Sequence, residues 1–218
     1  MIVPVNMIYR RVVKRPLDVA LSSLALLLFS PVMAVTAICI GLTLGKPILF
    51  RQTRIGKDEK AFMMLKFRTL TDQKDDDGTL LCDHRRLTQL GRFLRGTGLD
   101  ELPELVNIIR GDMSLVGPRP LLTGYLPYFT AAERARHRVR GGLIPPEVLY
   151  GNIRPTWAEQ LQYEADYAAN VSFLQDARIF LKALWGLFHR KNTDYGGYVR
   201  RQLSAERQSS MAEGGEHR

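Results

Sequence analysis

Apolar residues concentrate in one N-terminal stretch, and the rest of the chain alternates between short apolar runs and polar segments. Between Pro16 and Leu44 almost every residue is apolar, apart from Asp18 and a few serines and threonines. A straight helix over this stretch would be roughly 40 Å long, whereas the hydrocarbon core of a bilayer is ~30 Å thick. A single transmembrane helix is the simplest interpretation of the pattern.

The Ser30-Pro31 pair at the middle of the stretch supports a second interpretation, a re-entrant helix-break-helix. Pro31 cannot donate to the carbonyl of Leu27, and its ring clashes there, so we expect the helix to kink or break. The Ser30 hydroxyl can satisfy part of the freed backbone. Each half would then be about 14 residues, or roughly 20 Å, which is too short to cross alone.

Charged residues flank the apolar stretch at both ends. Four cations precede it and four follow it: Arg10, Arg11, Lys14 and Arg15, then Lys46, Arg51, Arg54 and Lys57. The positive-inside rule therefore selects no orientation for a span, and the residues leave a kinked span and a re-entrant hairpin open. Asp18 follows Lys14 by one helical turn, so the two can pair at the membrane interface or as a simple surface pair.

The segment after the apolar stretch has the pattern of a hairpin followed by a loop and a helix. Two short apolar runs, 47–50 and 61–65, surround a polar turn that contains Gly56, which predicts a β-hairpin. Alternation places Lys66 and Arg68 on one face, which could simply be a solvated basic face. Residues 71–84 form a polar loop whose acidic run lacks calcium-loop spacing. Leucines and Phe93 at helical spacing over 87–94 then predict an amphipathic basic helix, packed on the core or lying on an anionic membrane.

The stretch from Leu94 to Pro120 carries the candidate chemistry. Leu102, Leu105, Val106 and Ile109 repeat at helical spacing, with Pro103 in the first turn and Gly111 as the end of the helix. The acid pair Asp100-Glu101 opens this helix, where an Asp is ordinarily an N-cap. The nearby cations Arg95, Arg119, Lys66 and Arg68 suggest instead a metal and a phosphorylated substrate. The turn Gly117-Pro118-Arg119-Pro120 holds one arginine on a stiff backbone.

The C-terminal third contains further helix signals. Residues 127–138 are polar and basic and predict a surface helix, and Trp157 opens another helix. Asp176 is expected to cap a last helix with an apolar stripe formed by Ile179, Phe180, Ala183, Leu184 and Leu187. Trp185, Phe188, His189, Arg190 and Lys191 would end it as an interfacial element does, although a plain buried helix explains the stripe as well. Residues 191–218 are rich in Gly, Ser and charge, which predicts a flexible tail.

Composition narrows the possible partners. The chain has 218 residues and a formal net charge of +9, which suits nucleic acid, an anionic membrane surface or phosphorylated substrates. It contains no zinc-finger spacing and no aromatic-basic RNA motif, so we expect no nucleic-acid partner. The two cysteines, Cys39 and Cys82, do not form a disulfide framework, which favours a reducing compartment.

The segments from Arg95 to Pro103 and from Ser114 to Pro120 resemble the signature of the bacterial sugar transferases, the small monotopic polyprenyl-phosphate phosphoglycosyl transferases. The resemblance covers about residues 10 to 190, with several separated motifs in the family's order. It implies a mostly helical α+β fold. Residues 1–45 would form a re-entrant membrane helix hairpin broken at Ser30-Pro31. A short β-hairpin and amphipathic interfacial helices would surround a small cytoplasmic catalytic domain over residues 46–190.

The resemblance also implies a reaction. Asp100 would attack the β-phosphate of a UDP-sugar and release UMP, and polyprenyl (undecaprenyl) phosphate would then take the sugar phosphate from Asp100. Asp100 and Glu101 would hold Mg²⁺, and Lys66, Arg68, Arg95, Pro118 and Arg119 would bind the substrates. The enzyme would act at the cytoplasmic face of the bacterial inner membrane, in contact with its lipid, in the first membrane step of glycoconjugate assembly. A homo-oligomer is compatible with the sequence.

One turn departs from the family's pattern. Relatives carry a Pro-Gly-Ile/Leu-Thr-Gly turn, whereas this chain has Gly141-Gly142-Leu143-Ile144-Pro145-Pro146. The change leaves two interpretations open, an altered choice of sugar and a membrane adaptor of the same fold with weak or no activity.

Overall fold

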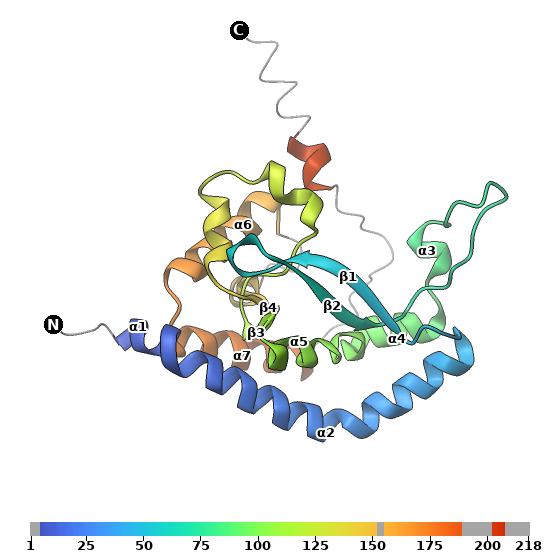
Figure 1. Ribbon diagram of the computed structural model, residues 1–218, viewed down its shortest axis with the longest axis horizontal. Coiled ribbons are helices and arrows are strands. Elements are labelled where there is room, and N and C mark those ends of the chain that lie inside the picture. Colours follow the sequence, from blue (N-terminus) through green and yellow to red (C-terminus); the bar gives the residue numbers. More distant parts are fainter. Residues whose placement is uncertain (1–4, 152–154, 189–201, 208–218) are drawn as a thin grey trace, which may run out of the picture.

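The computed structural model describes residues 5–151, 155–188 and 202–207, which form a mostly helical α+β fold with two small sheets (Figure 1). This is the predicted fold class. The helices are α1 (Val5–Ile8), α2 (Lys14–Thr43), α3 (Asp83–Arg86), α4 (Gln89–Thr97), α5 (Glu104–Arg110), α6 (Trp157–Ala169) and α7 (Phe173–Phe188). A π-helical turn, Tyr9–Val13, joins α1 to α2. The strands are β1 (Leu49–Ile55), β2 (Ala61–Phe67), β3 (Met113–Val116) and β4 (Gly141–Ile144).

The two sheets bring distant segments together. Strands β1 and β2 pair antiparallel from Leu49↔Phe67 to Ile55↔Ala61, which confirms the predicted hairpin. Strands β3 and β4 pair in parallel, with Met113 opposite Gly141. The second sheet joins the segment that carries Arg119 to the turn that departs from the family's pattern.

Helix α2 continues through Pro31 without interruption, but it bends near its middle (Figure 1). The Ser30 hydroxyl donates to the carbonyl of Leu27 at 2.8 Å and so takes the place of the N–H that Pro31 lacks. The kink predicted at Pro31 is therefore present as a bend, and the predicted hydrogen bond from Ser30 to the freed carbonyl is confirmed. Residues 27–32 are all exposed. Six consecutive residues cover every side of a helix with 3.6 residues per turn, so the bend stands away from the rest of the chain.

Both ends of α2 are fastened to the same globular body. Near the start, the Arg15 guanidinium donates to the carbonyls of Ile108 and Ile109 at 2.6 and 3.0 Å, and Asp18 accepts from the Ser114 hydroxyl at 2.6 Å. At the far end, Arg68 donates to the carbonyls of Leu44 and Lys46 at 3.3 and 3.1 Å. The two ends of this long apolar helix are thus held on one side of the molecule.

The Lys14–Asp18 pair expected from helical spacing is not the one that forms. The Lys14 ammonium lies 2.5 Å from Asp176, and Asp18 instead binds Ser114 and the backbone N–H of Leu115. Asp176 also accepts from the hydroxyls of Tyr9 and Tyr167, each at 2.7 Å. It lies inside α7 rather than at its cap, so the predicted capping role is wrong. Buried partners from other elements displace both local interactions.

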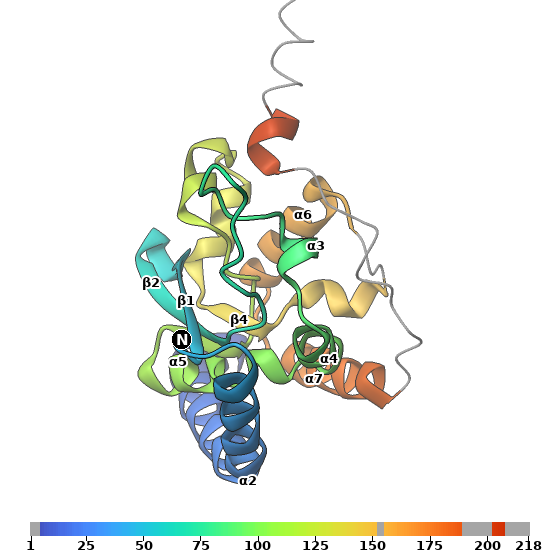
Figure 2. The ribbon, with the colours of Figure 1, turned by 90° about the vertical axis from the view of Figure 1, so that its right-hand side faces the viewer.

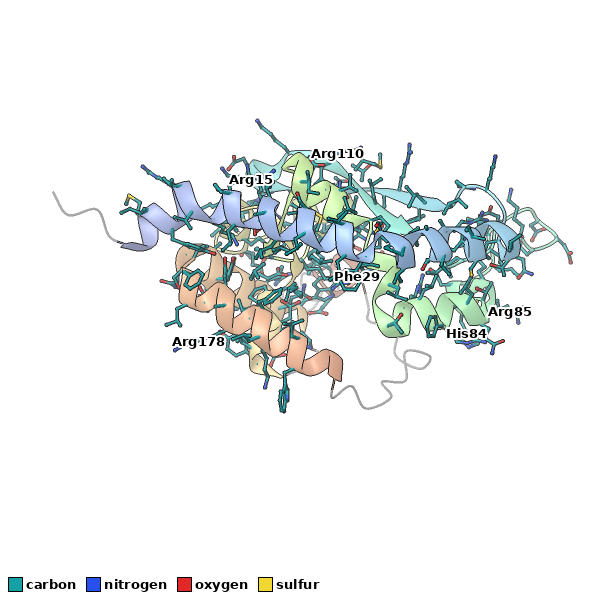
Figure 3. All side chains as sticks on the ribbon, turned by 90° about the horizontal axis from the view of Figure 1, so that it is seen from below. Arg15, Phe29, His84, Arg85, Arg110 and Arg178 are labelled. Atoms are coloured by element: carbon teal, nitrogen blue, oxygen red, sulfur yellow. The ribbon has the colours of Figure 1, made fainter. Side chains whose placement is uncertain are left out.

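Three helices form an exposed apolar face. Figure 2 shows α2 below the rest of the chain, and Figure 3, seen from below, shows α4 and α7 beside it. Helix α4 buries Leu94 and leaves Phe93 59 % exposed, beside the exposed polar residues Gln89, Arg92 and Thr97. The large exposed apolar residues of these helices are Leu21, Leu24, Leu27, Leu28, Phe29, Val32, Val35, Ile38, Leu42, Phe93, Phe173, Leu174, Leu181, Leu184 and Trp185.

The C-terminal third differs from the prediction in two places. Residues 127–138 do not form a surface helix but two 3₁₀ segments, Thr123–Tyr128 and Glu133–Arg138, with Arg136 and His137 buried. Residues 203–207, within the segment predicted to be flexible, are helical, and Leu203 is fully buried in a cluster with Ile55 and Trp157. Helix α6 begins at Trp157 as predicted, with a Thr156–Glu159 capping box. His189, Arg190 and Lys191, predicted as part of an interfacial helix end, lie outside the described residues.

Candidate functional site

The acid pair lies in a tight turn between two helices. Gly98 ends α4 with a left-handed φ of 76°, and Leu99–Glu101 form one 3₁₀ turn before Pro103 precedes α5. Pro103 is the N-cap residue of α5 and makes no side-chain cap, so Asp100 does not act as the N-cap. Gly111 ends α5 in the left-handed region, as predicted. The turn fixes Asp100 and Glu101 without using them for helix capping.

Two cations from other elements lie over these acids. The Lys66 ammonium, at the end of β2, lies 2.7 Å from Glu101 Oε1 and 3.1 Å from Glu104 Oε1. The Arg119 guanidinium, from the loop after β3, lies 3.7 Å from Glu101 Oε1. The structure therefore brings the predicted residues Glu101, Lys66 and Arg119 together, next to Asp100 in the same turn.

The loop that carries Arg119 is held at its backbone. Gly117 N–H donates to Ile144 O at 3.1 Å, and Pro118 O accepts from Gly142 N–H at 2.9 Å. Pro120 O accepts from Arg54 at 3.2 Å. A Cβ atom on Gly142 would lie 2.1 Å from the Gly117 nitrogen, so only glycine allows this approach. The stiff backbone predicted at this loop has its physical basis in these contacts.

A shallow recess opens beside Glu101, the second residue of the acid pair. It encloses about 290 Å³ including its open mouth. Its lining consists of Arg54, Met64, Lys66, Glu101, Glu104, Arg119, Pro120, Gly142 and Leu143. The recess thus joins the acid cluster to both residues 142 and 143 of the unusual turn.

Two functional candidates in the recess were not found from the sequence. Glu104 follows Glu101 by three residues, a spacing that puts both on one side of a helical turn, and this was the available signal. In the sequence, Arg54 is identifiable only as one of the cations that follow the apolar stretch. Burial, together with the positive charge of Arg119, lowers the pKa of Arg54. Two guanidinium groups held close together are stabilised when an anion binds between them.

Burial also shifts the carboxyl groups. Asp100 is only 8 % exposed, and burial and the charge of Glu101 raise its pKa, while Lys66 and Arg95 act in the opposite direction. Burial raises the pKa of Glu104 to about 7, against the lowering effect of the Lys66 charge. The acids are therefore more basic than free carboxylates, and their like charges favour a cation between them.

The remaining predicted residues lie around this centre or away from it. Arg95 donates to the Thr69 hydroxyl at 3.0 Å, and its charge acts on Asp100. Arg68 is nine-tenths buried and donates to the carbonyls of Leu44, Lys46 and Leu70. It holds the end of α2 and does not line the recess, so its role in substrate binding stays a prediction. Pro118 contributes a backbone carbonyl to the loop.

The donor set fits a magnesium ion that arrives with phosphate. Among the described residues, no three His, Cys, Asp or Glu side chains form a metal-binding group. Mg²⁺ is commonly held by one or two carboxylates together with substrate phosphates and water. Asp100 and Glu101 can supply such carboxylates, with the remaining ligands coming from outside the protein.

The chain is similar to known bacterial sugar transferases over most of its length. The model of the bacterial sugar transferase family matches residues 9–190. The chain is 39 % identical over 168 residues to the uncharacterized sugar transferase EpsL of Bacillus subtilis, which covers 77 % of this chain and 83 % of that protein. It is 35 % identical over 189 residues to a UDP-glucose:undecaprenyl-phosphate glucose-1-phosphate transferase of Caulobacter vibrioides, with 82 % and 71 % covered. The exopolysaccharide production protein ExoY of Rhizobium meliloti is 32 % identical over 188 residues, with 78 % and 83 % covered.

Proposed function

This chain belongs to the bacterial sugar transferase family, and we propose that it moves a sugar 1-phosphate from a UDP-sugar to polyprenyl phosphate, releasing UMP. The observation that carries the proposal is the turn in which the buried Asp100 precedes Glu101, whose carboxylate contacts Lys66 and Arg119. A carboxylate beside fixed cations is what a displacement at phosphorus requires. Relatives named as undecaprenyl-phosphate sugar-phosphate transferases support the same reaction class.

The reaction proceeds in two displacements on the Asp100 carboxylate. In the first, an Asp100 oxygen forms a bond to the β-phosphorus, and the bond from that phosphorus to the oxygen bridging the two phosphates breaks. UMP leaves with the bridging oxygen and its electron pair. In the second, an oxygen of polyprenyl phosphate attacks the same phosphorus, and the Asp100 carboxylate leaves as polyprenyl diphosphate sugar forms. The raised pKa of Asp100 makes its ionised form a better nucleophile than an ordinary carboxylate.

The cations of the recess position the diphosphate and stabilise the charge that develops on it. Arg119 can bind two phosphate oxygens with its planar guanidinium, and Arg54 lies in the same lining. Lys66 supplies a compact charge between Glu101 and Glu104. Mg²⁺, held by Asp100 and Glu101, would neutralise the diphosphate and improve UMP as a leaving group. Arg95 limits the negative charge around Asp100.

The apolar helix α2 would hold the catalytic residues at the membrane surface. Helix segment Tyr9–Thr43 is long and apolar enough to cross a bilayer, and little of it is buried in the protein. A crossing helix would separate its ends by ~30 Å of hydrocarbon, whereas both ends of α2 contact one body. The exposed bend at residues 27–32 would therefore enter one leaflet and return. The basic flanks at both ends favour the cytoplasmic side for the catalytic body.

The test is release of UMP by the full-length protein in lipid nanodiscs. Polyprenyl phosphate, Mg²⁺ and a panel of UDP-sugars are supplied, and UMP is measured over time. We expect release with at least one UDP-sugar and none from Asp100→Asn. Asp83→Asn, whose carboxylate is on α3 and 71 % exposed, serves as the control and should keep wild-type activity. Membrane-bound, folded protein that releases no UMP from any UDP-sugar would support the adaptor alternative instead.

A further inference from the structure

A fully buried ion pair lies behind the recess, and the proposed chemistry does not use it. Arg136 and Glu164 have side chains 1 % and 0 % exposed. The Arg136 guanidinium approaches one carboxylate oxygen of Glu164 with two nitrogens, at 2.7 and 2.6 Å. Arg136 comes from the 3₁₀ segment Glu133–Arg138, and Glu164 comes from α6. The pair therefore joins two elements that each lie outside the acid turn.

Both residues hold the backbone of Arg119. Glu164 Oε1 accepts from the Arg119 N–H at 2.8 Å, and Arg136 Nη2 donates to the Arg119 carbonyl at 2.6 Å. Prolines flank Arg119 on both sides, so its N–H is the only backbone donor between positions 118 and 120. The pair thus holds both backbone polar groups of the residue whose guanidinium lies over Glu101.

Stability does not explain the pair by itself. Removing two charges from water is unfavourable, and well-packed apolar residues of similar volume can replace a buried ion pair with little loss. What apolar residues cannot replace is the pair of hydrogen bonds to a backbone N–H and a backbone carbonyl. The presence of a buried ion pair at this place is therefore better explained by its hydrogen bonds to the Arg119 backbone.

The same pair is connected to the β1–β2 hairpin. Arg136 Nη1 lies 3.1 Å from His137 Nε2, and His137 Nδ1 lies 3.4 Å from Glu59 Oε1. Arginine can only donate, so His137 Nε2 must accept and its proton is on Nδ1. Glu59 lies in the turn of the hairpin that carries Lys66 and Arg54. His137 and Glu59 thus lie between Arg136 and the hairpin, although the buried His137 Nδ1 forms no hydrogen bond within the described part of the chain.

We propose that Arg136 and Glu164 are positioning residues that fix the Arg119 guanidinium in the recess and thereby set the affinity for the donor's diphosphate. The inference rests on the proposed function, because it takes Arg119 as a contact of the UDP-sugar. The two residues touch no reacting atom and act through the backbone of Arg119.

The test is a double-mutant cycle on KM and kcat for the UDP-sugar. In Glu164→Gln the amide oxygen can still accept from Arg119, but its NH₂ group opposes Arg136, so the loop loses its fixed geometry. We expect KM to rise ~10-fold in Glu164→Gln and more in Arg119→Gln, with the double variant within ~2-fold of Arg119→Gln alone. A purely structural defect would lower the active fraction, and therefore the apparent kcat, and leave KM unchanged.

Two further variants complete the design. Asp176→Asn removes another buried carboxylate, which contacts Lys14, Tyr9 and Tyr167 rather than Arg119, and its effect should multiply with that of Arg119→Gln. If Glu164→Gln does not fold, Gln160→Met removes the 3.1 Å bond to Glu164 and leaves the carboxylate in place, and a KM rise of ~2-fold is expected that vanishes in the Arg119→Gln background.

The outcomes separate the two proposals. A wild type that releases no UMP from any UDP-sugar overturns the proposed function, and the inference with it. A wild type that turns over, with a Glu164→Gln effect on KM that is absent or fully multiplicative with Arg119→Gln, overturns the inference alone.

Discussion

Replacing Glu104 by glutamine should stabilise the protein, and more so at alkaline than at acidic pH. Glu104 is 3 % exposed, lies 3.1 Å from Lys66, and has its pKa raised by burial to about 7. A carboxyl group whose pKa is higher in the folded than in the unfolded chain contributes most to stability when protonated. That contribution is present below the unfolded pKa of 4.5 and is lost as the pH rises through about 7.

The size of the effect follows from the shift. A rise from 4.5 to about 7 at ~1.4 kcal/mol per unit corresponds to about 3–4 kcal/mol at most. The glutamine side chain carries no charge at any pH, so the stability difference between variant and wild type should widen by about 2 kcal/mol between about pH 5 and about pH 8.5. At ~2–4 °C per kcal/mol for a chain of this size, Tm should diverge by about 4–8 °C.

Thermal unfolding in one detergent at the two pH values measures this divergence. Asp83→Asn, an exposed carboxylate paired with Arg86 at 3.6 Å, is the control and should stay within ~0.5 kcal/mol of wild type at both. The reasoning about this buried carboxyl is refuted if the Tm difference between Glu104→Gln and wild type is the same at both pH values. It is also refuted if the Tm of wild type rises relative to that of the variant at alkaline pH.

Two other predictions concern the loop and the membrane helix. Gly142→Ala should abolish UMP release and destabilise the fold by about 1–3 kcal/mol, because the new Cβ would lie 2.1 Å from the Gly117 nitrogen; activity and Tm near those of wild type would contradict the close approach. Single cysteines at positions 10 and 46, in a chain lacking Cys39 and Cys82, should react with a membrane-impermeant thiol reagent from the same side of oriented vesicles, because both ends of α2 contact one body. Labelling from opposite sides would establish a crossing helix.

Local patterns predicted the elements that local physics determines. The apolar stretch, the β1–β2 hairpin, the end of α5 at Gly111 and the start of α6 at Trp157 all depend on neighbours in sequence. The Ser30 hydroxyl bond to Leu27 is also an interaction within one turn. Such features follow from periodicity, capping and the missing N–H of proline.

Long-range contacts decided the rest. The expected Lys14–Asp18 pair is worth only a few tenths of a kcal/mol on a helix surface, and Lys14 binds Asp176 across the fold instead. The parallel pairing of β3 with β4 joins two four-residue strands far apart in sequence. Each strand is too short for its alternation of apolar and polar residues to be recognised. Arg136 belongs to a segment that looks like a solvated basic surface, and only the buried carboxylate of Glu164 explains its position.

The same distinction applies to the candidate site. Asp100, Glu101, Lys66 and Arg119 were selected by motif, and the fold gathers them in one place. Glu104 and Arg54 join them because α5 and β1 both face the recess. The spacing of residues along the sequence does not predict this arrangement. Arg68 shares a strand-like alternation with Lys66, yet it turns to the end of α2, because side chains just beyond a strand end no longer obey its alternation.

Direct capture of the loaded carboxylate tests the central claim. The full-length protein is incubated with Mg²⁺ and a UDP-sugar that supports turnover, without polyprenyl phosphate, then quenched in acid and analysed by intact and peptide mass spectrometry. The account predicts a mass increase of one sugar phosphate on the peptide containing Asp100, its disappearance when polyprenyl phosphate is added, and its absence from Asp100→Asn. Product formation by Asp100→Asn at the wild-type rate, or a sugar phosphate captured on a different side chain, would contradict it.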